Sequence, residues 1–193
     1  MTLATFSEAM RLCDPDLGDH ADRVSLRAQA VARRLGWSEA QIAEVAVGAA
    51  LHDVGKMNTR PEVLAKPGPL DDEERVHVRA HPVEGAWLVA GVGSLRSALP
   101  YVLFHHERWD GEGYPTGRTG REIPVEGRLL AVVDAFDAMT SPRPYRPALE
   151  VDEALRELER GAGTQFDPVI ASTFRAAWDA GELRSNVRLV ATA

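Results

Sequence analysis

The sequence predicts an all-α protein. Apolar residues recur at helical spacing along almost the whole chain, and no stretch shows the strict apolar–polar alternation of a half-buried strand. Proline and glycine clusters divide this pattern into pieces of helix length. The chain has 193 residues, of which 45% are hydrophobic and 26% are charged, so it can bury a core of its own. We therefore expect one helical domain over residues 1–183 and a short C-terminal extension over residues 184–193.

Charge and composition narrow the classes of function. A net charge of −7 disfavours binding to a nucleic-acid polymer, and an anionic substrate would need local positive charge or a metal. Cys13 is the single cysteine, which excludes a disulfide within the chain. The N-terminus lacks the features of a signal peptide, and no apolar run reaches the roughly 20 residues that cross a bilayer. We expect a cytoplasmic protein that does not bind a membrane.

The first two predicted helices lie in the N-terminal third of the chain. An apolar stripe ends at Gly36, and its members are Leu17, Val24, Ala28, Val31 and Leu35. Ser38 and Gln41 form a capping-box pattern, which predicts that a second helix begins here. The apolar face of that helix is given by Ile42, Val45 and Ala49. A break rich in proline and glycine spans Pro61–Pro69 and contains the expected loop KPGPL at residues 66–70.

The remaining helices follow in the same way. Acidic residues from Asp71 to Glu74 mark a helix start, since negative charge is favourable at a helix N-terminus. Pro82 restarts a helix in HPVEGAWLVAG, because proline is tolerated in the first turn. A further helix leads into His105, and turn-forming residues predict a loop over Gly111–Pro124. Three more helices are expected, at residues 127–140, near Val151–Arg160 and near Pro168–Ala180.

Several ionisable side chains fall on faces that the helical pattern assigns to the core. They are His20, His52, Asp53 and Asp134. His81 precedes a proline at a helix break, and an amphipathic pattern gives no reason for the adjacent pair His105 and His106. A single buried histidine or aspartate is ordinarily paired with a carbonyl group or an arginine. Several of them on inward faces of different helices instead indicate a shared ligand.

That shared ligand is predicted to be metal. Histidine and aspartate without cysteine suit iron, manganese or zinc, which imidazole nitrogen and carboxylate oxygen bind. Asp53 could bridge two ions while His52 binds one of them. His77 lies on a charged helix, and we expect it at the surface or behind the ligands.

Five motifs occur in the order that characterises a known family. They are LHDVGK at 51–56, AHP at 80–82, HHERWDGEGYPTG at 105–117, VVDAFDAMTSPRPYR at 132–146 and FDP at 166–168. This set resembles the HD-GYP domain, a branch of the HD phosphohydrolase superfamily, from about residue 20 to residue 174. A histidine–aspartate pair alone is a weak signal, whereas the doubled histidine together with the GYP loop is highly specific.

The resemblance implies a helical bundle of the HD-domain type that holds two or three divalent metal ions. Iron or manganese is expected, with zinc, nickel and magnesium as alternatives. The implied metal ligands are His20, His52, Asp53, His81, His105, His106 and Asp134. Asp53 and Lys56 are implied as catalytic residues. The implied substrate-binding residues are Lys56, Tyr114, Arg143 and Arg146.

The resemblance also implies an activity, the hydrolysis of cyclic di-GMP, a bacterial second messenger. The attacking group would be a hydroxide activated by metal, and the product would be pGpG, with further cleavage to GMP. Two alternatives stay open: hydrolysis of another nucleotide, including a mixed cyclic dinucleotide, and non-catalytic sensing of the ligand. A homodimer or a signalling-protein partner is compatible with either.

A third ion is expected to involve Asp16. Some family members carry a glutamate four residues before the first-helix histidine, and Asp16 stands four residues before His20. Positions i and i+4 share a helical face, although aspartate is one methylene shorter than glutamate. The alternative is that Asp16, which follows Pro15, only favours the start of the helix through the macrodipole.

Overall fold

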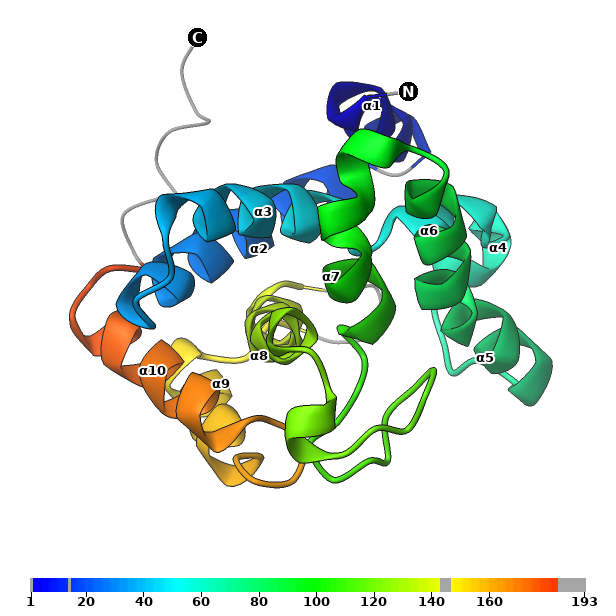
Figure 1. The fold of residues 1–193 in the computed structure, drawn as a ribbon. Coiled ribbons are helices and arrows are strands. Elements are labelled where there is room, and N and C mark those ends of the chain that lie inside the picture. The colour runs from blue at the N-terminus through cyan, green and yellow to red at the C-terminus, as the bar shows by residue number, and fades with distance from the viewer. Residues whose placement is uncertain (1, 14, 143–146, 184–193) are drawn as a thin grey trace, which may run out of the picture.

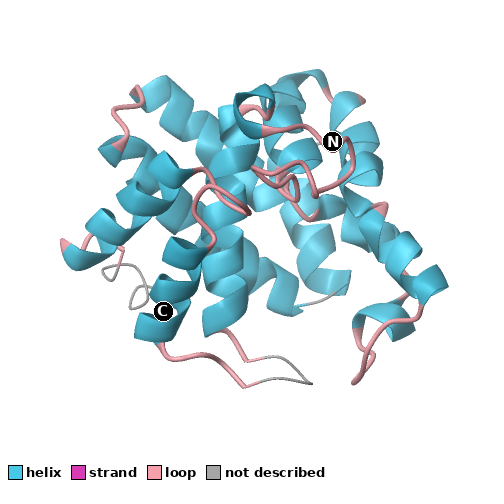
Figure 2. Cartoon of the chain, turned by 90° about the horizontal axis from the view of Figure 1, so that it is seen from below, coloured by secondary structure: helices cyan, strands magenta, loops and turns pink. Residues whose placement is uncertain are grey.

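Helix α8 (Val125–Thr140) runs through the middle of the molecule, and other helices pack around it (Figure 1). The structure is a computed structural model that describes residues 2–13, 15–142 and 147–183. Within these ranges the chain forms helices and loops and no β-strand, so the predicted all-α class is confirmed (Figure 2). Helix α8 is largely apolar, and seven of its residues are buried. Its central position follows from that composition.

The N-terminal helices enclose one side of α8. Helix α2 (Pro15–Arg34) and helix α3 (Glu39–Leu51) occupy the two predicted segments. The capping box between Ser38 and Gln41 is present, so the predicted start of α3 is confirmed. Helix α1 (Leu3–Cys13) was not predicted, yet it buries Phe6 and Met10 almost completely.

The next segment contains one departure from expectation. The break predicted over Pro61–Pro69 begins with the short helix α4 (Pro61–Leu64), and the loop KPGPL at residues 66–70 is confirmed. Pro61 lies in the first turn, where its fixed φ favours a helix, and Val63 is buried beneath it. A 3₁₀ turn, η1 (Val54–Asn58), precedes α4. Helix α5 (Asp72–Arg79), capped by Asp71, and helix α6 (His81–Ala90) follow as predicted.

The helix expected before His105 is divided in two. Its first part is a 3₁₀ turn, η2 (Gly93–Ala98), and its second part is helix α7 (Leu99–Phe104). The loop expected over Gly111–Pro124 contains a third 3₁₀ turn, η3 (Gly120–Glu122). Helix α9 (Val151–Arg160) and helix α10 (Pro168–Asp179) confirm the last two predictions.

Buried apolar side chains form two clusters that meet near the His52–Asp53 pair. The main cluster joins α2, α3, α8, α9 and α10 and includes Ala49 and Val133. The smaller cluster joins α1, α6, η2 and α7 and includes Leu51 and Val54 on either side of the pair. Polar residues between the two clusters are positioned by the packing of both clusters. None of the helices in the described ranges combines the length and apolar character that a bilayer crossing needs.

Candidate metal centre

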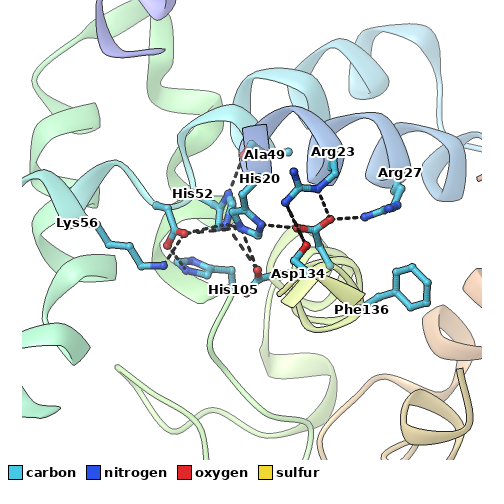
Figure 3. Close-up of polar contacts among 12 residues, drawn as sticks. His20, Arg23, Arg27, Ala49, His52, Lys56, His105, Asp134 and Phe136 are labelled. Carbon is cyan, nitrogen blue, oxygen red and sulfur yellow. Dashed lines mark hydrogen bonds and ion pairs between the residues drawn. The ribbon is translucent and has the colours of Figure 1, made fainter. Parts of the chain in front are cut away.

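Seven ionisable side chains come together where the two apolar clusters meet. Figure 3 labels four of them, namely His20, His52, His105 and Asp134. The first group consists of Asp53, His81, His105 and His106. The second group consists of His20, His52 and Asp134. Within each group, one nitrogen or oxygen atom from every residue lies within 4.8 Å of the others. The side chains expected on core faces therefore gather in two places that are each suited to a cation.

Three histidines are held by the same local contact at the end of a helix. His52, His81 and His105 each place Nδ1 2.7–2.8 Å from the carbonyl oxygen three residues earlier. The last carbonyl groups of a helix lack partners within the helix, so the ring N–H supplies one. His52 and His105 are the C-cap residues of α3 and α7, and His81 follows the C-cap of α5. Helix C-termini also carry partial negative charge, which favours a bound cation.

This contact determines which ring nitrogen carries the hydrogen. A carbonyl oxygen only accepts, so Nδ1 donates, and Nε2 of the neutral ring keeps its lone pair. The Nε2 atoms of His81 and His105 lie 3.1 Å apart, and those of His20 and His52 lie 3.2 Å apart. In the His81–His105 pair, two lone pairs of neutral rings at this separation repel each other unless a positive charge lies beside them. Each pair offers ring nitrogens of the kind that a divalent metal ion binds, the second pair once His20 has lost its extra proton.

Asp53 lies between the two groups and turns one oxygen toward each. Its Oδ1 is 3.3 Å from Nε2 of His81 and 3.7 Å from Nε2 of His105. Its Oδ2 is 3.5 Å from Nε2 of His52 and 3.8 Å from Nε2 of His20. Oδ1 is buried and has no hydrogen-bond partner among the described residues. An unpartnered carboxylate oxygen is costly to bury, so the residues fit a metal at this position.

Lys56 contacts the same carboxylate. Its Nζ lies 2.6 Å from Oδ2 of Asp53 (Figure 3 labels Lys56). Burial raises the pKa of Asp53, but the nearby charge of Lys56 opposes this effect, and the pKa of Asp53 is held well below its usual range. The carboxylate is therefore ionised, which is the form that binds a cation.

Asp137 is a functional residue that sequence reasoning missed. Its Oδ2 lies 2.7 Å from Nδ1 of His20, and it is 1% exposed. Arg23 donates to it from Nε at 2.8 Å and from Nη2 at 2.9 Å, and Arg27 makes a further contact (Figure 3 shows both arginines). Asp137 stands three residues after Asp134 and so shares its helical face, which is the signal that could have found it.

Burial and hydrogen bonding divide the histidines by charge. Burial lowers the pKa of His52 to about 4, and it also lowers the pKa values of His81 and His106. These rings are neutral near pH 7, as metal ligands must be. Burial lowers the pKa of His20 too, but hydrogen bonds with Asp134 and Asp137 outweigh it and raise that pKa to about 9. An ion that enters the second group therefore displaces a proton from His20.

The GYP loop folds back against the first group. The ring of Tyr114 stacks on His106 with centroids 4.8 Å apart and planes at 25°. The backbone N–H of Tyr114 donates to the carbonyl oxygen of His106 at 3.2 Å. A Cβ atom at Gly113 would lie 2.3 Å from the backbone nitrogen of Arg108, so only glycine allows this close approach.

Glu107 binds the GYP loop through its carboxylate, and the sequence analysis did not predict this role. Its side chain is buried, and Oε1 accepts hydrogen bonds from the backbone N–H of Thr116 at 2.6 Å and from its hydroxyl at 2.7 Å. Oε2 accepts from the backbone N–H of Gly117 at 3.1 Å. A carboxylate with three donors in one loop fixes the loop relative to the end of α7.

The other predicted site residues lie elsewhere. Asp16 is exposed and is not a member of either group. His77 is half-buried, accepts a hydrogen bond from the backbone N–H of Arg60, and is outside both groups, as expected. Arg143 and Arg146 lie outside the described residues.

Comparison with known proteins places the chain in a family. The HD domain family matches residues 5–170. The chain belongs to the HD domain family. The predicted resemblance is thereby confirmed.

Two named relatives align with most of this HD domain chain. It is 38% identical to a cyclic di-GMP phosphodiesterase of Thermotoga maritima over 163 residues, 83% of this chain and 44% of the relative. It is 40% identical to the cyclic di-GMP phosphodiesterase response regulator RpfG of Xanthomonas campestris over 169 residues, 86% of this chain and 45% of the relative. The chain thus spans less than half the length of these two proteins.

The solved structures agree on the HD domain fold. The crystal structure of a cyclic GMP-AMP specific phosphodiesterase of V. cholerae superimposes with a TM-score of 0.74 at 16% identity. The match covers 97% of this chain and 50% of that one. At this identity the likeness concerns the fold alone, and it confirms the predicted helical bundle of the HD type.

Proposed function

We propose that this chain is a metal-dependent phosphodiesterase that hydrolyses cyclic di-GMP to pGpG and, by a second cleavage, to GMP. The observation that carries the proposal is the pair of groups around Asp53, with facing Nε2 atoms and a buried, unpartnered carboxylate oxygen. Two relatives with 38% and 40% identity bear the name of this activity, which supports the choice of substrate. The activity would take place in the cytoplasm, where a second messenger acts.

The residues of the two groups are proposed as the ligands of two divalent ions, iron or manganese. His81, His105 and His106 would hold one ion, His20, His52 and Asp134 would hold the other, and Asp53 would bridge them. Two divalent ions activate water for attack on phosphorus and neutralise the charge that grows on its oxygens. The ligands themselves orient the site, because their ring N–H groups are fixed on the helix ends.

Four further side chains are proposed to handle the substrate. Lys56 lies beside Asp53 and can donate a hydrogen bond to a non-bridging phosphate oxygen or, through water, to the departing 3′-oxygen. Tyr114 is placed by the GYP loop beside His106, where a phenol can contact a base or a phosphate. The roles proposed for Arg143 and Arg146, bidentate binding of phosphates, rest on the PYR motif.

The proposal is tested by turnover. The purified chain is loaded anaerobically with Fe(II) or Mn(II) and incubated with cyclic di-GMP, and pGpG and GMP are separated by chromatography. We expect both products, and we expect none from Asp53→Ala, which also loses metal. His77→Ala is the matched control, since this histidine lies outside both groups and its loss should leave turnover unchanged.

The same experiment separates the alternatives. Parallel reactions with 3′3′-cGAMP and cyclic di-AMP show whether another cyclic dinucleotide is the better substrate. Metal-loaded protein that binds cyclic di-GMP and never releases pGpG or GMP contradicts the catalytic proposal and supports a sensor. Normal turnover by Asp53→Ala removes the bridging role of this carboxylate.

We also propose a third, weaker metal site that uses Asp16. Asp16 and His20 share a face of α2, and the exposed side chain of Asp16 can reach an ion held partly by water. Metal analysis of the loaded wild type and Asp16→Ala tests this role. A fall of about one equivalent is expected on mutation. Two equivalents in both proteins would leave Asp16 as a residue that only favours the start of the helix.

A further inference from the structure

A cavity of about 270 Å³ opens beside both metal-binding groups. His106 of the first group and Asp134 of the second group line it, together with Tyr114 of the GYP loop. A molecule in this cavity therefore meets both groups at once. Two arginines, Arg79 and Arg108, also line its wall.

Arg108 forms an ion pair with a carboxylate, whereas Arg79 forms none among the described residues. The guanidinium of Arg108 binds Asp110 through two nitrogens, at 3.0 Å from Nε and 2.6 Å from Nη2. Arg79 is exposed in the last turn of α5, and it forms no ion pair with any carboxylate in the described ranges. The charge of Arg79 is thus available to an anion in the cavity. In a chain with a net charge of −7, such a local cation favours an anionic ligand.

Tyr114 holds this guanidinium at the cavity. The Cζ of Arg79 lies 4.8 Å from the centroid of the Tyr114 ring, within the range of a cation–π contact. The guanidinium N–H groups of Arg79 form no hydrogen bond with the described residues, so they are available to bind oxygen. Tyr114 in turn rests on His106, so Arg79 is positioned relative to the first group by two stacked rings.

We propose that Arg79 binds the second phosphodiester of the cyclic dinucleotide, the one that is not being cleaved. This inference rests on the proposed function. A cyclic dinucleotide carries two phosphates on opposite sides of one ring, so when one phosphate is at the metal groups, the other needs a cation elsewhere. Arg79 provides that cation at the wall of the cavity that both groups share, and a guanidinium binds a phosphate through two hydrogen bonds.

The test compares a substrate with two phosphodiesters and a substrate with one. Wild type, Arg79→Ala and Arg79→Lys are loaded with metal, and KM and kcat are measured for cyclic di-GMP and for bis(p-nitrophenyl) phosphate. Calorimetry gives the Kd of a phosphorothioate analogue of cyclic di-GMP that resists hydrolysis. Arg75→Ala is the matched control, because Arg75 lies one turn earlier in α5, is exposed and pairs with Asp72 at 3.0 Å. Metal content is measured for every variant.

Arg79→Ala should raise the Kd of the analogue and the KM for cyclic di-GMP by about ten- to a hundredfold. Its hydrolysis of bis(p-nitrophenyl) phosphate should match that of wild type, Arg79→Lys should lie between, and Arg75→Ala should behave as wild type. An unchanged Kd in Arg79→Ala, or an equal loss of activity on both substrates, overturns the role proposed for Arg79 and leaves the proposed function intact. A wild-type chain that binds no cyclic dinucleotide overturns the proposed function instead.

Discussion

At the scale of the residue, one histidine of the site departs from the geometry of three others. His52, His81 and His105 stand at helix ends and use the free carbonyl three residues earlier. His20 lies within α2 (Pro15–Arg34), where the backbone carbonyls are already paired along the helix. It therefore needs an acceptor from elsewhere, and Asp137 of α8 provides it at 2.7 Å. The two arginines on α2 hold Asp137 in place, so the helix that carries the histidine also holds its acceptor.

Asp137→Asn should weaken metal binding by the second group. The neutral amide accepts a weaker hydrogen bond from His20 and leaves Arg23 and Arg27 without a counter-charge. Loss of such a supporting contact lowers metal affinity by about ten- to a hundredfold. The measurement is retention of metal during titration with a chelator. Asp179→Asn, which removes an exposed partner of Arg175, is the control, and identical chelator curves for all three proteins would contradict the role of Asp137.

At the scale of the element, the site depends on a close crossing of η1 and α6. Gly55 lies in η1, two residues after Asp53, and it faces the start of α6, which carries His81. A Cβ atom on Gly55 would lie 2.0 Å from the carbonyl oxygen of His81 and 2.6 Å from the backbone nitrogen of Gly85. Both neighbours are backbone atoms, so neither can rotate away. The two elements touch through their main chains, and this contact sets the distance between Asp53 and His81.

Gly55→Ala should lower the free energy of unfolding by about 1–3 kcal/mol, the usual cost of overpacking. It should also reduce the metal bound by the first group, because α6 must move away from Asp53 to admit the methyl group. Denaturant unfolding and metal analysis measure the two effects. The control is Gly68→Ala, where a Cβ atom would meet nothing within 4 Å. Equal stability of both variants would show that the crossing has room to relax.

Most features encoded by residues close together in the sequence were predicted correctly, and features that depend on distant residues were not. Helix starts such as Ser38–Gln41 and Asp71 were predictable because a cap and its partner lie within one turn. The inward faces of His20 and Asp134 were predictable from helical spacing. The contact between His20 and Asp137 joins residues 117 positions apart, and no local pattern encodes it. The helical turn at Pro61 was missed because proline marks both loops and helix starts.

At the scale of the whole molecule, the two groups tie together elements from most of the chain. Their residues come from α2, α6 and α8 and from the ends of α3 and α7, and they lie where the two apolar clusters meet. A metal ion that binds only this arrangement stabilises the folded state by mass action. Metal bound at these two groups would therefore contribute part of its binding energy to the folding of both clusters.

Removal of metal should lower the melting temperature of the whole domain. An ion present at a hundred times its Kd contributes about 2.7 kcal/mol, which corresponds to a shift of about 5–10 °C for a chain of this size. Thermal unfolding of the metal-loaded protein, with and without chelator, measures the shift. Asp53→Ala should unfold at the same temperature in both conditions, since it lacks the carboxylate that faces both groups. A chelator effect of equal size in this variant would place the stabilising ion elsewhere.

His52 and Asp53 are neighbours in the chain, yet they belong to different groups. A single peptide unit therefore sets the separation of the two groups, and Asp53 contacts both. The remaining histidines each serve one group, so substitutions there change one ion's surroundings at a time. Over evolutionary time, a lineage that adapts to a different metal supply can vary those histidines separately. Asp53 has no such freedom, because any change at this carboxylate alters the surroundings of both groups in the same generation.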